Sequence, residues 1–325
     1  MGARVKIVLA SVLPLPNLHH FSIKSSNTEF NRLALTSGEN YGLKGSGFLT
    51  IIDTNHHLQV IKQFQWSDAL FDVTWGEQYN NIAVTVSGDG SFQVWDISEE
   101  TLNPKLVIKA HSIESCCVEW DVTNIASRFL TTSWDKTLKV WDISEGPICI
   151  CEISHPSIVY SGQWAPFSPH LIAIAGSDGY LVQRDLRNSK SQISAIQAHQ
   201  PEILSCSWSP QNQFTIATGG CDRYVKIWDT RQLQSPITIL TGQRQTVKRV
   251  KMNPHSETLL GSCGYDNNWI LWDYSNKNCL FVSNWHTNFC YGFDFDRNVN
   301  GQFYTCAWDS KVISARYESK YLSKL

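Results

Sequence analysis

Residues 87–96 read SGDGSFQVWD, a ten-residue frame with an aspartate at its third place and Trp-Asp at its end. The frame returns as SWDKTLKVWD at 133–142, GCDRYVKIWD at 220–229 and GYDNNWILWD at 264–273. Seven copies in all follow one another at intervals of 43 to 46 residues. The three weaker copies end at Ile52-Asp53, Arg184-Asp185 and Ala315-Arg316. Alternating apolar residues between Gly and Asp turns predict short strands within each copy.

An internal repeat of this length that closes with Trp-Asp is the signature of WD40 propeller blades. We therefore predict an all-β, seven-bladed WD40 β-propeller over residues 18–325. Residues 1–17 are expected to form a tail and a closing strand, since such a ring closes when a strand from one terminus completes the blade begun at the other. A secretory signal is the alternative for this tail, but Pro14 and Pro16 interrupt its apolar run.

Two copies carry a set of polar residues that matches the hydrogen-bonded tetrad of WD40 blades. The two sets are His111, Thr131, Asp135 and Trp141, and His199, Thr218, Asp222 and Trp228. Each member must find its partner, because a buried polar group left unpaired costs about 1–3 kcal/mol. The other copies lack at least one member, and we expect those blades to be held mainly by apolar packing.

The same histidines and aspartates raise the alternative of catalysis. Pairs that recur in several repeats are better explained as architecture, because a hydrolase needs one nucleophile activated by one base. The chain has no G-x-S-x-G, H-E-x-x-H or Walker sequence, and none of its ten cysteines forms a Cys-x-x-Cys pair. We therefore predict a protein that is not an enzyme, with no metal and no cofactor, in a reducing compartment.

The net charge of the protein predicts no general attraction to nucleic acid. The net charge is −2 and the isoelectric point is near 6.5. One basic cluster consists of Arg244, Lys248, Arg249 and Lys251, and alternation along a strand favours a solvated edge over an anion site there. No stretch of the sequence is long and apolar enough to predict a membrane span.

Propellers usually bind partners on the face where the residues just after the His position and just before the turn aspartate emerge. Counting along the repeats places eighteen residues on this rim, and seven of them are aromatic. Two carboxylates, Glu114 and Glu202, belong to the set, and Asp68 is close by. Aromatic anchors beside a few acids suit an amphipathic helix that carries a cation. The alternative is that some of these aromatics only fill the central funnel.

The sequence resembles the peroxin-7 family, the receptors for the type-2 peroxisomal targeting signal. The likeness runs from about Phe21 to the end of the chain. It is most specific at NRLAL (31–35), YGLKG (41–45), SDALFDVTW (67–75), HQPEILSCSW (199–208) and HTNF (286–289).

The resemblance implies a cytoplasmic receptor that shuttles to the peroxisome matrix. Its implied partners are matrix proteins with the type-2 signal, such as thiolase-like enzymes, a co-receptor peroxin or the long form of the type-1 signal receptor, and the peroxisomal docking complex. By this analogy Glu114 and Glu202, with Asp68, would pair with the arginine of the signal peptide. The apolar face of the peptide would then contact Phe71, Trp134, Tyr160, Leu204, Phe289 and Trp308.

The last three residues, Ser323, Lys324 and Leu325, match the tripeptide of a type-1 peroxisomal signal. Two interpretations stay open: a second address that the type-1 receptor reads, or a tail that lies against the closing blade. Under the first, deleting the tripeptide should reduce peroxisomal residence. For the whole protein, the competing hypothesis is a generic WD40 scaffold or substrate adaptor in a multiprotein complex.

Overall fold

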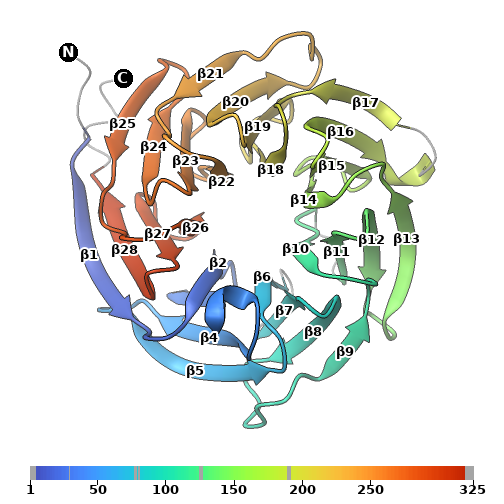
Figure 1. The fold of residues 1–325 in the computed structure, drawn as a ribbon, viewed down its shortest axis with the longest axis vertical. Helices are drawn as coiled ribbons and strands as arrows, with labels where there is room; N and C mark the ends of the chain where they lie inside the picture. Colours follow the sequence, from blue (N-terminus) through green and yellow to red (C-terminus); the bar gives the residue numbers. More distant parts are fainter. Residues whose placement is uncertain are drawn as a thin grey trace.

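A computed structural model describes residues 5–28, 30–76, 79, 81–123, 127–188 and 192–318. Within these residues 28 strands form seven four-stranded antiparallel sheets, arranged as the blades of a closed ring (Figure 1). The all-β, seven-bladed propeller predicted from the sequence is confirmed. Two short 3-10 helices, η1 (Asn40–Gly42) and η2 (Leu186–Asn188), lie in the connections between strands.

Blades 1 to 6 each run outward from the centre of the ring in chain order. Blades 1 and 2 comprise β2 (His19–Ser25), β3 (Arg32–Gly38), β4 (Gly47–Asp53), β5 (Gln59–Trp66), β6 (Leu70–Trp75), β7 (Ile82–Ser87), β8 (Ser91–Asp96) and β9 (Leu106–Lys109). Blades 3 and 4 comprise β10 (Ser115–Trp120), β11 (Arg128–Ser133), β12 (Thr137–Asp142), β13 (Ile148–Ser154), β14 (Val159–Trp164), β15 (Leu171–Gly176), β16 (Tyr180–Asp185) and β17 (Gln192–Gln197). Blades 5 and 6 comprise β18 (Ile203–Trp208), β19 (Thr215–Gly220), β20 (Tyr224–Asp229), β21 (Thr238–Thr241), β22 (Val247–Met252), β23 (Leu259–Gly264), β24 (Trp269–Asp273) and β25 (Asn278–Val282).

Blade 7 is assembled from both ends of the described chain. It contains β26 (Cys290–Phe295), β27 (Gln302–Ala307) and β28 (Lys311–Tyr317), and β1 (Ile7–Pro14) pairs with β28 as its outermost strand. The pairing is antiparallel, from Ile7 opposite Tyr317 to Pro14 opposite Lys311. β1 thereby covers the edge of β28, and the N-terminal strand closes the ring within blade 7 (Figure 1).

The apolar core is divided among the contacts between neighbouring blades. Seven clusters of buried residues each combine side chains from two adjacent sheets. One example joins Phe64 of blade 1 to Trp75 and Trp95 of blade 2. Period-two alternation turns one face of each sheet toward each neighbour, so a closed ring buries both faces of every blade.

The two tetrads have the geometry of connected hydrogen-bond chains. Trp141 Nε1 donates to Thr131 Oγ1 at 3.0 Å, and His111 lies 2.8 Å from that hydroxyl and 3.0 Å from the carboxylate of Asp135. Burial lowers the pKa of His111 despite the opposing charge of Asp135, which keeps its ring neutral. A neutral ring can accept from the threonine through Nε2 and donate to the aspartate through Nδ1.

Blade 5 repeats this chain of contacts. His199 lies 2.7 Å from both Asp222 and Thr218, and Trp228 Nε1 donates to Thr218 Oγ1 at 2.9 Å. Blade 7 has three of the four members: His286 lies 2.9 Å from Thr305 and 3.1 Å from Asp309. Ala315 stands in the place of its tryptophan, so this blade keeps the His–Asp contact without the indole donor.

The interpretation of the basic cluster as a solvated edge is wrong for two of its members. Both lie on β22, the innermost strand of blade 6. The side chains of Arg249 and Lys251 are only 18% and 15% exposed, and they form ion pairs with Asp72 and Asp294 in the central channel. A propeller turns its innermost strands toward the axis, and a count along one strand cannot distinguish that position from an outer edge.

Candidate functional site

One backbone hydrogen bond recurs in six blades and brings the two series of rim residues together. The residue just before the turn aspartate donates its N–H to the carbonyl of the residue three places after the His position, at 3.0–3.1 Å. The pairs are Gly88–Ala69, Trp134–Glu114, Ser177–Ile158, Cys221–Glu202, Tyr265–Thr246 and Trp308–Phe289. The two counts along the sequence therefore meet at one end of the inner strands.

The aromatic surface, as we call it, consists of Phe21, Tyr41, Phe71, Tyr265, Phe289, Tyr291 and Trp308. Trp308 is at its centre, stacked on Tyr291 with ring centroids 4.7 Å apart and lying 5.5 Å from Phe289. Phe21 is only 4% exposed, so it supports the surface from below, and it connects this group to Phe71 of blade 2 through an edge-to-face contact at 5.0 Å. The surface thus spans blades 6, 7, 1 and 2 without a break.

Two members of the aromatic surface escaped prediction because blade 1 lacks the repeat markers. Phe21 lies on β2, and Tyr41 lies in η1 with a φ of 61°. Tyr41 has a left-handed backbone, and its ring centroid lies 5.3 Å from that of Trp308 and 3.8 Å from that of His19. The one local signal is the cluster of glycines around Tyr41, which indicates an irregular turn there.

The other predicted apolar contacts lie apart from the aromatic surface. Trp134 is 44% exposed and meets Tyr160 edge to face at 6.5 Å, so these rings form a second, smaller aromatic pair on blades 3 and 4. Leu204 is only 8% exposed, which leaves little of its side chain for a ligand.

Carboxylates occupy the same end of the ring. Partial burial raises the pKa of Asp68 against the hydrogen bond from the Ala69 N–H, and the nearby charges of Asp89 and Glu114 raise it further. Glu202 lies on blade 5, where its Oε2 is 3.5 Å from Cys221 Sγ. Asp68 and Glu114 therefore lie close to each other, while Glu202 lies apart from them, near Tyr160. Like charges held together favour the binding of a cation.

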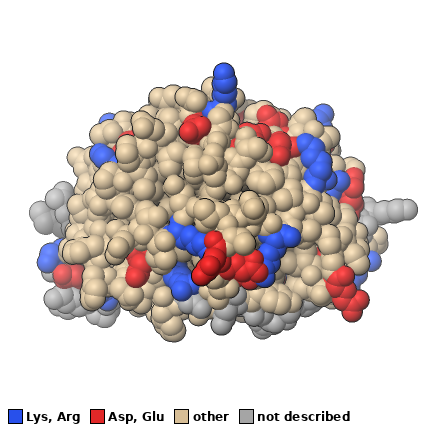
Figure 2. Space-filling view, turned by 90° about the horizontal axis from the view of Figure 1, so that it is seen from below, with Lys and Arg blue, Asp and Glu red and all other residues tan. Residues whose placement is uncertain are grey.

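Figure 2 shows the outer side of the ring, at right angles to the view of Figure 1. Acidic and basic side chains are intermingled on this side of the ring, and most of the area carries neither. Ser323, Lys324 and Leu325 lie outside the described residues. No helix within the described residues is both long and apolar enough to cross a membrane.

Fold and repeat together define a seven-bladed propeller of the WD40 class with an aromatic and acidic rim. The chain belongs to the EIPR1 beta-propeller family, whose model matches residues 48–272.

Curated relatives are more specific. The chain is 38% identical to the peroxisomal targeting signal 2 receptor of Mus musculus over 51% of this chain and 52% of the relative. It is 36% identical to the receptor of the same name from Homo sapiens over 51% of each chain. Peroxisome biogenesis protein 7 of Arabidopsis thaliana is 32% identical over 37% of this chain and 39% of its own length. The chain thus spans about half the length of the mouse and human relatives it matches, and the resemblance predicted from the sequence is confirmed.

Proposed function

We propose that the protein is an import receptor that binds the N-terminal type-2 peroxisomal targeting signal of matrix proteins. It delivers them, with a co-receptor, to the docking complex of the peroxisome. The receptor is not an enzyme, and it shuttles between the cytoplasm and the peroxisome matrix. The names of the mouse, human and plant relatives support this role.

The observation that carries the proposal is the combination of aromatic surface and carboxylates at one end of the ring. A site for a helical peptide with an arginine and apolar side chains on one face needs an apolar contact surface and a negative charge close to it. In this proposal Phe71, Phe289 and Trp308 form the apolar contact surface. The negative charge comes from Asp68 and Glu114. Trp134, Tyr160 and Glu202 extend the contact along the rim.

The first experiment measures fluorescence anisotropy of a labelled nonapeptide that carries the type-2 signal. The purified protein is titrated with and without a candidate co-receptor, beside a peptide in which the arginine is alanine. We expect saturable binding that requires the arginine. Absence of binding even with co-receptor would contradict the receptor function and favour the scaffold or adaptor class.

Two substitutions test the charge. Glu114→Gln and Glu202→Gln keep the size and polarity of the side chain but remove its charge, so each should weaken peptide binding by about tenfold, the value of one charge-assisted contact. Glu145→Gln, an exposed change in the β12–β13 connection, is the matched control. If both rim variants stay folded and bind as tightly as the wild type, the arginine pairs elsewhere.

A further inference from the structure

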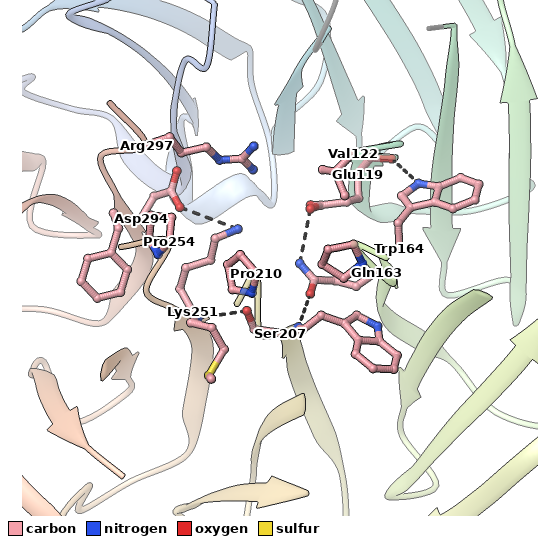
Figure 3. A pocket seen from close by; sticks show the side chains of 14 residues that line it. Glu119, Val122, Gln163, Trp164, Ser207, Pro210, Lys251, Pro254, Asp294 and Arg297 are labelled. Atoms are coloured by element: carbon pink, nitrogen blue, oxygen red, sulfur yellow. Dashed lines mark hydrogen bonds and ion pairs between the residues drawn. The ribbon is translucent and has the colours of Figure 1, made fainter. Parts of the chain in front are cut away.

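The two ends of the central channel are bordered by different kinds of side chain. At the end away from the rim, polar side chains contact one another. Lys251 Nζ lies 3.7 Å from Asp294 Oδ1, and Gln163 Nε2 donates to Glu119 Oε1 at 3.3 Å (Figure 3). These contacts join neighbouring blades. The rim end is bordered by the aromatic surface, and one connection between strands lies beside its rings.

This connection joins β3 to β4 in blade 1 and is longer than its equivalents. It comprises eight residues, 39–46, which we call the rim loop. The equivalent connections have three residues in five blades and four in blade 6: 88–90, 134–136, 177–179, 221–223, 308–310 and 265–268. Each of these carries a turn aspartate, which blade 1 lacks. Blade 1 therefore has an insertion at the rim where the other blades have a tight turn.

The rim loop has a strained backbone. Asn40, Tyr41 and Gly42 are all left-handed, with φ of 45°, 61° and 76°. Asn40 Nδ2 donates to the Lys44 carbonyl at 3.1 Å and holds this turn together. A left-handed backbone is costly for a side chain as bulky as that of tyrosine. Strained residues of this kind cluster at ligand-binding sites, so the conformation of Tyr41 indicates that the loop has a function.

His19 connects the rim loop to the inner strand of blade 1. The Tyr41 N–H donates to His19 Nδ1 at 3.1 Å, and the two ring centroids lie 3.8 Å apart. Partial burial lowers the pKa of His19, which favours the neutral ring that can accept at Nδ1. Tyr41 also contacts Trp308, with ring centroids 5.3 Å apart. The loop is thus attached to the aromatic surface at its edge.

The backbone of the rim loop also packs directly on two rings of the aromatic surface. A Cβ at Gly42 would lie 2.8 Å from the ring of Phe21 and 3.1 Å from that of Phe71. A glycine is required here both for this close approach and for its left-handed φ. The loop therefore lies between β2 and β6, close to the centre of the ring (Figure 1).

The rim loop exposes apolar side chains next to the aromatic surface. Leu43 is 88% exposed, the largest exposed fraction among the large apolar residues that the structure describes. Tyr41, two residues earlier, is 48% exposed. A single exposed leucine needs no explanation, but one that extends an exposed aromatic surface is part of a continuous apolar patch. Such a patch is typical of a binding site.

We propose that the rim loop is a side wall of the peptide site, in which Leu43 and Tyr41 contact an apolar side chain on the flank of the bound helix. This inference rests on the function proposed above. A helix is about 10 Å across with its side chains, so one that lies on Phe71 and Trp308 is thick enough to contact the loop beside these rings as well. The wall selects helices whose apolar residues occupy two adjoining faces, and His19 positions it.

The test is fluorescence anisotropy of the labelled nonapeptide with the purified full chain, with and without a candidate co-receptor. Leu43→Ser should weaken peptide binding about tenfold, as the loss of one apolar contact implies. Tyr41→Asn should weaken it too, since asparagine tolerates the left-handed backbone and only the ring is lost. The matched control is Ile237→Ser in the β20–β21 connection, where the isoleucine is 52% exposed, and it should bind as the wild type does.

Peptides in which each apolar residue in turn is alanine identify the group that Leu43 contacts. With one of these peptides Leu43→Ser should cost less than about twofold, because the contact is already lost. If Leu43→Ser weakens binding equally with every peptide, Leu43 contacts the co-receptor or another segment, and the assigned contact is refuted.

Two variants of His19 test its positioning role. The Oδ1 of His19→Asn can still accept the Tyr41 N–H, so this variant should bind the peptide more tightly than His19→Leu. Equal losses in the two variants would refute the role of His19.

Failure of the wall and failure of the receptor function give different results. Wild-type affinity in both Leu43→Ser and Tyr41→Asn would overturn the wall and leave the receptor function intact. A wild-type protein that does not bind the nonapeptide even with co-receptor would refute both.

Discussion

At the scale of single residues, burial lowers the pKa of three histidines, His20, His111 and His199. His20 is fully buried on β2, and this burial lowers the pKa of its ring to about 3, against contacts with Ser310 and Asp309 that act in the opposite direction. His111 and His199 are shifted in the same direction for the same reason. The folded protein therefore resists protonation at sites where the unfolded chain accepts protons.

This difference predicts that stability falls on mild acidification. Below pH 6.5 the unfolded chain protonates His20 and the folded chain does not until about pH 3, so this residue alone costs about 1.4 kcal/mol per pH unit in that window. His20→Leu should lose that part of the dependence when urea unfolding is measured at pH 7.5 and 5.5. His57→Leu, on an exposed turn, should behave as the wild type. Equal slopes for all three proteins would contradict the prediction.

At the scale of elements, the close approach of neighbouring sheets depends on small residues. Gly261 on β23 faces the ring of Phe293 on β26, and a Cβ at this glycine would lie 2.1 Å from that ring. Sheet-on-sheet packing at about 10 Å leaves no room for both groups unless one sheet moves. The glycine therefore sets the spacing between blades 6 and 7.

Gly261→Ala is expected to destabilise the protein by about 1–3 kcal/mol, the usual cost of overpacking a core. Urea unfolding followed by circular dichroism measures the change. Adding Phe293→Leu should recover part of the loss, because a smaller side chain then faces the new methyl group. Gly76→Ala is the control, since the nearest atom to its Cβ is 3.3 Å away. A loss of the same size in the control would mean that the contact with Phe293 is not the cause, since Gly→Ala by itself lowers the entropy of the unfolded chain and favours folding.

At the scale of the whole molecule, ion pairs join blades across the channel. Arg249 of blade 6 lies 3.4 Å from Asp72 of blade 2, and Lys24 of blade 1 lies 3.2 Å from Glu119 of blade 3. These contacts connect blades that are not neighbours.

Arg249→Met should cost about 3–5 kcal/mol, because it removes the ion-pair partner of the buried carboxylate of Asp72. The double variant with Asp72→Asn should regain most of this loss, since asparagine can still accept the Val118 N–H without carrying a charge. Chemical unfolding of the four proteins in a double-variant cycle gives the coupling. Additive effects would mean that the pair does not interact across the ring.

The sequence by itself determined the repeat and therefore the fold. The turn aspartate and the closing Trp-Asp recur because every blade needs the same hairpin and the same packing against its neighbour. The spacing of His111, Asp135 and Trp141 led to the tetrad contacts for the same reason. Counting from these markers also identified the rim pairs, since one backbone hydrogen bond per blade holds each pair together. The role of these rim residues in binding stays a prediction.

Only the tertiary structure decided what lies at the centre of the ring. Phe21 and Tyr41 join the aromatic surface through contacts with blade 7 that exist only once the ring has closed. Arg249 meets Asp72 across 177 residues of chain, and no periodicity encodes that distance. Local spacing determines contacts within a blade, whereas the number of blades and their closure determine which side chains share the axis.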